Sequence, residues 1–268
     1  MLQAKLQLLE DIFQEMESVL IAFSGGVDST FLLHTAARLL EENKLRRLLA
    51  VTIRAPMCPD WELREAEDYA RSLGVEHVLL ELDIMELPEF VANPPRRCYY
   101  CKRALFEELL DLADERGLSY VIDGSNKDDE GDYRPGRDAL KELGIRSPLW
   151  EVGLTKSEIR EASRTLGLPT WDKPSYACLA SRIPYGVEIT ADKLRLIDRA
   201  EGYLRELGFR QVRVRYHHEL ARIEVEQGEL KRLVDHGPQI VERLTELGFL
   251  YVTADLGGYR TGSLNAPL

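Results

Sequence analysis

The strongest chemical signal in the sequence is a segment rich in glycine and hydroxyl groups near the N-terminus, Ser24-Gly25-Gly26-Val27-Asp28-Ser29-Thr30. Two adjacent glycines allow a tight turn and let a ligand approach the backbone closely. If the segment opens a helix, the unpaired amides of the first turn and the positive end of the helix dipole favour phosphate. The Gly-x-x-x-x-Gly-Lys-Ser/Thr spacing of the ordinary nucleotide loop is absent. We therefore expect a different kind of phosphate-binding loop, the alternative being a capped strand-to-helix turn.

Three of the four cysteines form the second signal. Cys98 and Cys101 are one helical turn apart, and the basic residues beside them would favour the thiolate form that binds metals. Cys178 follows much later in the chain. The residues alone leave three possibilities open, which are a [4Fe–4S] cluster with one open iron, a zinc site and unliganded thiols. The zinc site would be completed by Cys58, His217 or His218; otherwise Cys58 is interpreted as an incidental thiol.

The composition excludes several classes of protein. The 268 residues include 35 Lys and Arg against 46 Asp and Glu, a net charge of −11, which does not suit a nucleic-acid binder. Apolar stretches such as 19–23 are far shorter than the roughly 20 residues of a membrane helix. Charged residues interrupt the N-terminal region, so it lacks the apolar core of a signal peptide. We expect a cytoplasmic protein with no nucleic-acid or membrane partner and no disulfide framework.

The elements that must position these residues alternate in type. Apolar runs predict strands at 19–23, 48–53, 77–82 and 120–123, and helical periodicity predicts helices at 2–17, 27–42, 60–73, 99–116, 135–143 and 156–166. This order predicts an α/β fold with a doubly wound parallel sheet. From Thr190 the pattern changes to a helix at 191–207, strands at 212–216 and 221–225, a helix at 230–247 and a strand at 251–255. We therefore predict a larger α/β domain at 1–186 and a smaller α+β domain at 187–268.

The glycine-rich segment resembles the S-G-G-x-D-S pyrophosphate loop (PP-loop) of the ATP pyrophosphatase superfamily. The resemblance implies that ATP is cleaved between its α- and β-phosphates while a carbonyl or carboxyl oxygen of the substrate is adenylated. It also implies that Asp28 places Mg²⁺ and that the main chain of residues 24–30 holds pyrophosphate. Further nucleotide contacts are implied for Ala22, Phe23, Gly124 and, at the adenine, Thr52, Ile53 and Arg54.

The chain as a whole resembles the LarE family of ATP-dependent sulfurtransferases. The resemblance is carried by Asp132-Tyr133-Arg134-Pro135-Gly136, Ser181-Arg182-Ile183-Pro184-Tyr185-Gly186, Arg213-Val214-Arg215 and Asp255-Leu256-Gly257-Gly258-Tyr259-Arg260. Members adenylate a carboxylate of pyridinium-3,5-biscarboxylic acid mononucleotide and convert it to a thiocarboxylate during nickel-pincer nucleotide synthesis. One subgroup sacrifices the sulfur of a single cysteine. Because Cys98 and Cys101 accompany Cys178 here, the chain is similar to the other subgroup, in which three cysteines hold a [4Fe–4S] cluster that carries the sulfur.

The resemblance also implies roles for other residues and for partners. Catalysis would involve Cys178, Asp28 and Arg182, with ATP, Mg²⁺ and the cluster as cofactors. Sulfide or a sulfur-donor protein would supply sulfur, and a homo-oligomer is expected. Arg213 and Arg215 would bind phosphate, the alternative being a solvated strand face, and Glu201 and Glu224 would line a metal site. Asp129, Glu130 and Arg134 would gate the substrate pocket or simply cap a loop. The alternative functions are a tRNA thiolase of the same superfamily and a nucleotide-binding regulatory protein with structural zinc.

Overall fold

The computed structural model describes residues 2–131, 135–260, 262 and 264 of the chain. The chain divides into two compact units, one of Met1–Ile84 and Arg96–Ser175 and the other of Met85–Pro95 and Tyr176–Leu268. The helices and strands of the first unit are α1 (Leu2–Met16), β1 (Ser18–Ala22), α2 (Val27–Glu41), β2 (Arg47–Arg54), α3 (Asp60–Ser72), β3 (Glu76–Glu81), α5 (Arg97–Glu115), β4 (Tyr120–Ile122), α6 (Gly136–Glu142), α7 (Pro148–Glu151) and α8 (Lys156–Thr165). Those of the second are α4 (Pro88–Val91), α9 (Ala191–Glu206), β5 (Val212–His217), β6 (Leu220–Val225), α10 (Leu230–Asp235), α11 (Gly237–Leu247) and β7 (Tyr251–Ala254).

The first unit is built on a four-stranded sheet with the order β3-β2-β1-β4, in which every pair of neighbours is parallel. Successive side chains of a strand point to opposite faces. In β1, Val19 and Ile21 therefore join one buried apolar cluster and Leu20 joins another. Burial on both faces explains why this strand is a continuous apolar run in the sequence.

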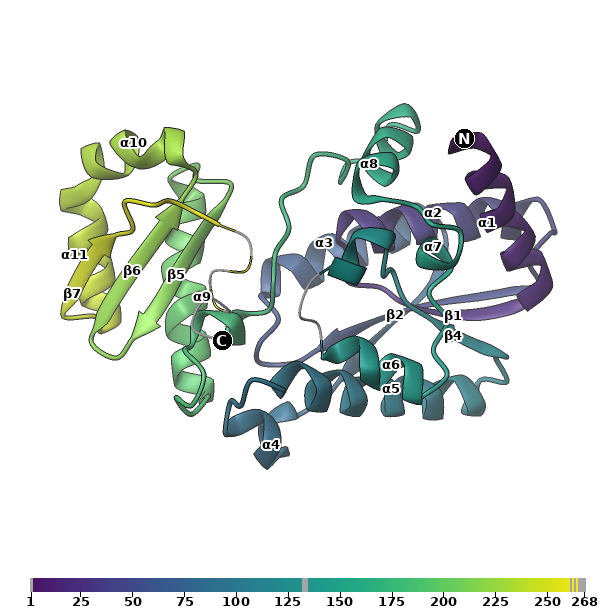
Figure 1. Cartoon of the computed structure of the whole chain (residues 1–268), viewed down its shortest axis with the longest axis horizontal. Coiled ribbons are helices and arrows are strands. Elements are labelled where there is room, and N and C mark those ends of the chain that lie inside the picture. The colour runs from purple at the N-terminus through teal and green to yellow at the C-terminus, as the bar shows by residue number, and fades with distance from the viewer. Residues whose placement is uncertain (1, 132–134, 261, 263, 265–268) are drawn as a thin grey trace. The chain divides into compact units, whose positions relative to one another are not determined.

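Helices cover both faces of this sheet, as Figure 1 shows. The cluster on one face draws residues from α1, α2, α3 and α8, and the cluster on the other draws residues from α5 and α6. The predicted α/β fold with a doubly wound parallel sheet is confirmed. The carboxyl ends of parallel strands are where such sheets bind ligands, so the connections that follow β1, β2 and β4 define the place to look for a site.

The second unit contains a three-stranded sheet with the order β5-β6-β7, in which β5 and β6 are antiparallel and β6 and β7 are parallel. Its apolar core combines one face of this sheet with residues of α9, α10 and α11. The predicted smaller C-terminal α+β sheet unit is therefore present. No helix in the described part of either unit is long and apolar enough to cross a membrane.

One predicted helix is wrong in its length. The sequence suggests a single helix at 230–247, whereas the structure contains α10 and α11 with a break at His236. Pro238 has no amide hydrogen and its ring clashes with the preceding turn, so it is tolerated in the first turn of a helix and not in the interior. The division between the compact units falls after Ser175, and the domain boundary near Gly186 stays a prediction.

Candidate functional site

The loop between β1 and α2 presents a row of backbone amides. The Phe23 amide donates to the Val51 carbonyl at 2.8 Å, and the Thr30 amide donates to the Gly26 carbonyl at 2.9 Å. From the amides of residues 24–29, which lie between them, we find no hydrogen bond to any described residue. Gly26 is the N-cap of α2 and makes no side-chain cap. A run of unpaired amides at a helix N-terminus is the arrangement that binds phosphate groups.

Two glycines allow this loop to pack closely against its surroundings. Gly25 has a φ of +68°, a conformation that glycine adopts without strain, and a Cβ added there would lie 3.1 Å from the Cβ of Ala66. Gly124 follows β4, and a Cβ on it would lie only 3.0 Å from the amide nitrogen of Ser29. The connection after β4 therefore touches the first turn of α2, which places predicted nucleotide-binding residues from two strands side by side.

The hydroxyl groups of the loop are close together but differ in their partners. The Oγ atoms of Ser24 and Ser29 are 3.1 Å apart, and Ser29 Oγ also donates to the Gly26 carbonyl at 3.3 Å. The Thr30 hydroxyl is buried and has no hydrogen-bond partner among the described residues. Ser24 and Ser29 thus place their hydroxyl groups together beside the amides, whereas the Thr30 hydroxyl is enclosed.

Asp28 is in the first turn of α2, and its carboxylate has one partnered and one unpartnered oxygen. Lys156 Nζ lies 2.5 Å from Asp28 Oδ2, whereas Oδ1 is buried and has no hydrogen-bond partner among the described residues. Burial raises the pKa of Asp28, and the charge and hydrogen bond of Lys156 only partly oppose that shift. A buried carboxylate oxygen without a donor fits a divalent cation, because Mg²⁺ is bound by carboxylates together with substrate phosphates.

Lys156 is a site residue that the sequence analysis missed. It is the first residue of α8, where Thr155 and Glu158 form a capping box that fixes the start of the helix. The Thr-Lys-Ser-Glu pattern that produces this cap is visible in the sequence, but nothing local shows that the lysine reaches Asp28, which is 128 residues away. The structure therefore adds a cation to the predicted phosphate site.

The three residues predicted to contact adenine lie at the end of β2. The Thr52 hydroxyl donates to the Phe23 carbonyl at 2.7 Å and lies 2.9 Å from His77 Nε2. Since a hydroxyl has one hydrogen, His77 must donate to Thr52 through Nε2. The Thr52 side chain therefore links the end of β2 to Phe23, the residue that follows β1, behind the loop. Arg54 forms an exposed ion pair with Glu81 at 3.3 Å. Adenine contact by Thr52, Ile53 and Arg54 stays a prediction.

The remaining predicted loop neighbours are apolar, and nucleotide contact by them stays a prediction. Phe23 is buried against the rings of Tyr69 and His77, with centroids 6.3 and 6.4 Å away. Val27 is buried in the same core, and Ala22 is the last residue of β1. These residues fix the position from which the loop leaves the sheet.

All four cysteines are half-buried. Cys98 and Cys101 lie in the first turns of α5 at a spacing that puts both on one helix face. Cys178 belongs to the second compact unit, where it directly precedes a short 3₁₀ helix at Leu179–Arg182. Among the described residues, no three or more His, Cys, Asp or Glu side chains are gathered as a set of metal ligands. The thiol chemistry fits an iron–sulfur cluster, and the cluster stays a prediction.

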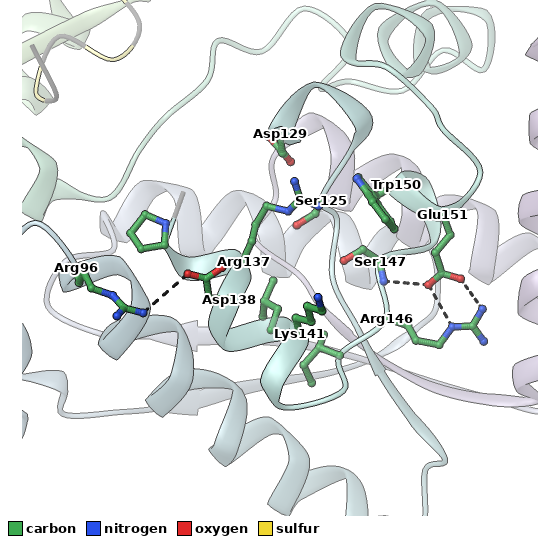
Figure 2. Close-up of a pocket in the computed structure, with 13 residues that line it drawn as sticks. Arg96, Ser125, Asp129, Arg137, Asp138, Lys141, Arg146, Ser147, Trp150 and Glu151 are labelled. Atoms are coloured by element: carbon green, nitrogen blue, oxygen red, sulfur yellow. Dashed lines mark hydrogen bonds and ion pairs between the residues drawn. The ribbon is translucent and has the colours of Figure 1, made fainter. Parts of the chain in front are cut away.

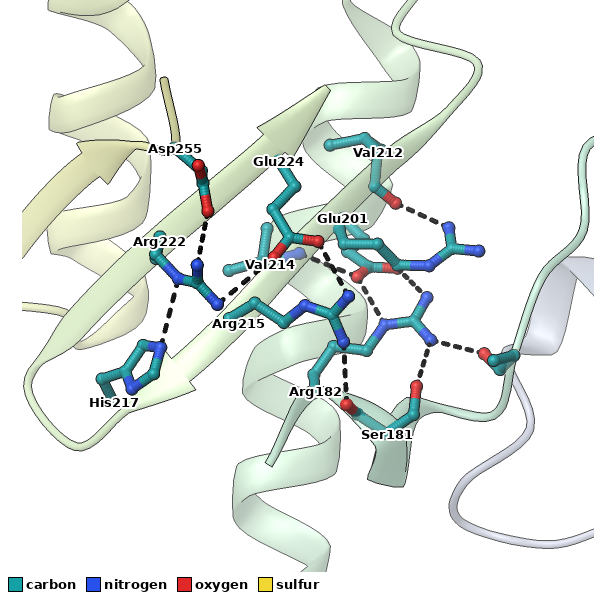
Figure 3. A network of polar contacts seen from close by, with 12 residues as sticks. Ser181, Arg182, Glu201, Val212, Val214, Arg215, His217, Arg222, Glu224 and Asp255 are labelled. Carbon is teal, nitrogen blue, oxygen red and sulfur yellow. Dashed lines mark hydrogen bonds and ion pairs between the residues drawn. The ribbon is translucent and has the colours of Figure 1, made fainter. Parts of the chain in front are cut away.

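Arg182 is the centre of a buried polar network in the second unit, which Figure 3 shows. Its guanidinium donates from Nε and Nη2 to the two oxygens of Glu201, both at 2.8 Å. Its Nη1 donates to the carbonyls of Ala177 and Cys178 at 2.5 and 3.1 Å. The side chains of Arg182 and Glu201 are each only 1% exposed. Arg182, a predicted catalytic residue, therefore fixes the backbone at Cys178.

Arg213 and Arg215 lie on the face of β5 opposite Val212 and Val214, as the alternation in the sequence predicts, but this face is covered. Both arginines are buried. Arg215 donates to the Ser181 carbonyl at 2.9 Å and to Glu224 at 2.7 Å. The alternative of a solvated strand face is thus wrong, because the segment before α9 packs over it.

The guanidinium of Arg213 lies over the rings of Tyr176 and Tyr259, 5.2 and 5.3 Å from their centroids. Burial and the positive charge of Arg182 lower the pKa of Arg213 to about 10. Phosphate binding by Arg213 and Arg215 stays a prediction.

The two glutamates predicted to line a metal site already face cations. Burial alone would raise the pKa of Glu201, but the charge and hydrogen bonds of Arg182 outweigh burial and hold this pKa below its usual value. Glu224 lies 2.7 Å from Arg215 and 3.2 Å from Arg222. A metal would have to replace these arginines, so the metal role of Glu201 and Glu224 stays a prediction.

A cavity of about 850 Å³ opens in the first unit beyond the edge strand β4. Figure 2 shows Arg137 and Lys141 of α6 on one side of it and Trp150 of α7 on the other. Arg137 lies 5.3 Å from the Trp150 ring centroid. Asp129, predicted to gate the substrate pocket, is in the cavity wall, where its Oδ2 accepts from the Asn126 amide at 2.9 Å. The side chain of Glu130 and residues 132–134, including Arg134, lie outside what the structure describes.

Comparison with known proteins identifies the family. Residues 1–86 match the model of a PP-loop domain. Over its full length the chain is 46% identical to an uncharacterised protein of Synechocystis, of which it covers 99%. It is also 37% identical over its full length to the pyridinium-3,5-bisthiocarboxylic acid mononucleotide synthase of Lactiplantibacillus plantarum, of which it covers 96%. A tRNA-specific 2-thiouridylase of Heliobacterium modesticaldum is 32% identical over 59% of this chain and 50% of its own length. The chain therefore belongs to the family of the L. plantarum synthase, the LarE family expected from its motifs, and is an ATP-dependent enzyme with a PP-loop domain.

Proposed function

We propose that the protein is a sulfurtransferase that adenylates a carboxylate of pyridinium-3,5-biscarboxylic acid mononucleotide and replaces its oxygen with sulfur. The observation that carries the adenylation half is the row of unpaired amides at residues 24–29 beside the unpartnered Oδ1 of Asp28. The substrate class rests on the full-length similarity to the L. plantarum synthase. ATP, Mg²⁺ and the pyridinium mononucleotide are the ligands that this proposal requires.

In the first step, a carboxylate oxygen of the substrate attacks the α-phosphorus of ATP, the bond to the bridging oxygen breaks, and pyrophosphate leaves. The amides of the loop and the α2 dipole stabilise the charge that develops on pyrophosphate. Lys156 adds a positive charge at the same place. Asp28 would hold Mg²⁺ through Oδ1, and the ion would neutralise phosphate charge there.

The cavity beyond β4 is proposed to take the part of the acid that does not react. It borders the loop through Ser125, the neighbour of Gly124. Arg137 and Lys141 are four residues apart on α6, and Figure 2 shows both on the cavity side. These cations complement an acid that carries two carboxylates and a phosphate.

In the second step, sulfide attacks the carbonyl carbon of the adenylate, the bond from that carbon to the phosphate oxygen breaks, and AMP leaves with the bonding electrons. We propose that Cys98, Cys101 and Cys178 hold a [4Fe–4S] cluster, which when bound would supply an iron position that carries the sulfide. Arg182 holds the Cys178 backbone through two carbonyls. None of the three thiols is consumed in this scheme.

The alternative of a tRNA thiolase has less support. The tRNA-modifying relative aligns with 59% of the chain, whereas the synthase aligns with all of it. The net charge of −11 also opposes binding of a polyanion the size of tRNA. The alternative of a regulatory nucleotide-binding protein with structural zinc also has less support, because the chain belongs to a family of ATP-dependent enzymes.

The adenylation half is tested by pyrophosphate release from ATP in the presence of the dicarboxylate mononucleotide. Asp28→Ala is expected to abolish release. Asp60→Ala is the matched control, because Asp60 is in the first turn of α3, which follows β2 as α2 follows β1. Asp60→Ala is expected to leave the rate unchanged. Normal release by Asp28→Ala would contradict the assignment of the loop.

The sulfur-transfer half is tested on protein purified without oxygen. Iron and acid-labile sulfide are expected at about four of each per chain, and stoichiometric zinc without iron would contradict the cluster. With sulfide supplied, several turnovers should leave the polypeptide mass unchanged. Cys98→Ala should stop thiolation and spare pyrophosphate release, and Cys58→Ala, the control, should spare both. A chain lighter by one hydrogen sulfide after reaction, with dehydroalanine at Cys178, would show that the cysteine itself is the donor.

A further inference from the structure

Lys173 lies on the segment that follows α8, and its ammonium group contacts the glycine-rich loop. Its Nζ donates to the Gly25 carbonyl at 2.9 Å and to Glu65 Oε2 at 2.8 Å. It also lies 5.3 Å from the centroid of the Trp61 ring. The side chain is 12% exposed, so its bond to the carbonyl is largely shielded from water and charge-assisted.

The position of this bond matters because of peptide geometry. The peptide unit between Gly25 and Gly26 is planar and trans, so its carbonyl and its amide hydrogen point in opposite directions. Neither flanking residue has a side chain that would restrict rotation of this unit. With the carbonyl held by Lys173, the Gly26 amide is turned to the other side of the loop. That amide belongs to the unpaired row at residues 24–29.

The backbone that carries Lys173 is itself held. Arg160 of α8 donates from Nη1 to the Trp171 carbonyl at 2.6 Å and from Nη2 to the Lys173 carbonyl at 2.7 Å. The same helix begins with Lys156, which contacts Asp28. One helix therefore fixes both the cation at the start of α2 and the segment that holds the Gly25 carbonyl.

We propose that Lys173 is a positioning residue that orients the Gly25–Gly26 peptide so that the Gly26 amide binds the pyrophosphate part of ATP. The inference rests on the proposed adenylation function. It adds that Lys173, bonded to the Gly25 carbonyl on one side of this peptide, sets the direction of the Gly26 amide on the other side. Lys173 does not itself touch the phosphate in this arrangement.

The test is the affinity of the whole chain for inorganic pyrophosphate and for ATP, measured by calorimetry with Mg²⁺. Lys173→Met keeps most of the apolar stem and removes the donor, and it is expected to weaken both affinities about tenfold. Lys173→Arg keeps a cationic donor and should stay within about threefold of the unchanged protein. The KM for the acid substrate should not change in either variant.

Lys5→Met is the matched control. Lys5 also bonds a backbone carbonyl, that of Gly153 at 2.7 Å, and a carboxylate, Glu158 at 2.7 Å, but within the described part of the chain it has no hydrogen bond to the loop. It is expected to lower thermal stability to a degree similar to Lys173→Met and to leave both affinities unchanged. Glu65→Gln removes the ion pair of Lys173 but not its carbonyl bond, and should also bind normally.

The outcomes separate the two proposals. If the unchanged protein binds neither pyrophosphate nor ATP, the proposed function fails and this inference fails with it. If the unchanged protein binds both and Lys173→Met binds equally well, only the role of Lys173 is overturned. Equal losses in Lys173→Met and Lys5→Met, or in Lys173→Met and Lys173→Arg, would likewise show that the effect comes from general destabilisation and overturn the inference.

Discussion

Replacing Glu201 by glutamine separates a structural ion pair from a metal ligand. Glu201 accepts two hydrogen bonds from Arg182 at 2.8 Å and a third from the Val214 amide at 2.9 Å, and both charged side chains are 1% exposed. Glutamine keeps one acceptor oxygen, but its amide group would face the guanidinium, donor against donor. The change also leaves the charge of Arg182 buried without its counter-charge. Removing one partner of a buried pair costs about 3–5 kcal/mol.

The free energy of unfolding is measured by urea denaturation in the presence of EDTA. Glu201→Gln is expected to lose about 3–5 kcal/mol, whereas the control Glu67→Gln is expected to lose about 0.5 kcal/mol or less, because its ion pair with Arg71 is exposed. A loss below about 1 kcal/mol for Glu201→Gln would refute the reasoning. A loss that appears only when a divalent metal is added would show that Glu201 is a metal ligand.

The pH dependence of the same difference gives a second check. The pKa of Glu201 in the folded chain lies below its usual value, because Arg182 outweighs the effect of burial. The ion pair therefore stabilises the fold fully above the unfolded pKa of about 4.3, and this contribution is lost as the pH falls through the folded value. The unchanged protein and Glu201→Gln should consequently differ most near neutral pH and converge in acid. A difference that grows on acidification would contradict the ion pair.

Three further predictions concern the nucleotide loop. Lys156→Met should slow pyrophosphate release about tenfold, because a charged hydrogen-bond donor contributes about 1.5–3 kcal/mol. It should also move the acid limb of the pH profile to higher pH, because Lys156 opposes the rise in the pKa of Asp28; an unmoved limb would contradict this. Gly124→Ala should weaken ATP binding in calorimetry without changing the acid KM, because its Cβ would lie 3.0 Å from the Ser29 amide nitrogen; unchanged ATP affinity would count against the packing argument. Chelation of Mg²⁺ should stop pyrophosphate release and added Mg²⁺ should restore it, and release that continues in chelator would remove the assigned role of Asp28.

The fold of the first unit was predictable because its signals are local. Buried parallel strands such as β1 are continuous apolar runs, and the helices between them have one apolar face. The break between α10 and α11 also had a local signal, since Gly237 and Pro238 stand together. It was missed because the apolar periodicity continues on both sides of the break. Periodicity measures which face is buried and does not by itself show that the backbone is continuous.

The site was predictable only where its residues are contiguous in the sequence. The loop at residues 24–30 contains its glycines, hydroxyls and carboxylate in a row, so residue types alone indicate phosphate chemistry. Lys156 and Lys173 reach the same loop from 128 and 148 residues away along the chain. Contacts of that kind arise from tertiary packing, and a lysine in a helix cap or a loop has the same sequence appearance when it faces solvent.

The arginines of β5 show a different limit of sequence reasoning. Alternation with Val212 and Val214 placed Arg213 and Arg215 on the face away from the core, which is where they are, but both are buried by the segment before α9. Arg215, which is assigned to phosphate binding, therefore also holds the backbone at Ser181, beside Arg182 and the carbonyl of Cys178. Loss of activity in an arginine variant would follow equally from lost ligand contact and from a displaced Cys178. Replacing Arg215 removes one of the two arginines that face the buried Glu224, so the free energy of unfolding reports how far the network is disturbed. Stability has to be measured alongside activity for every residue of this network.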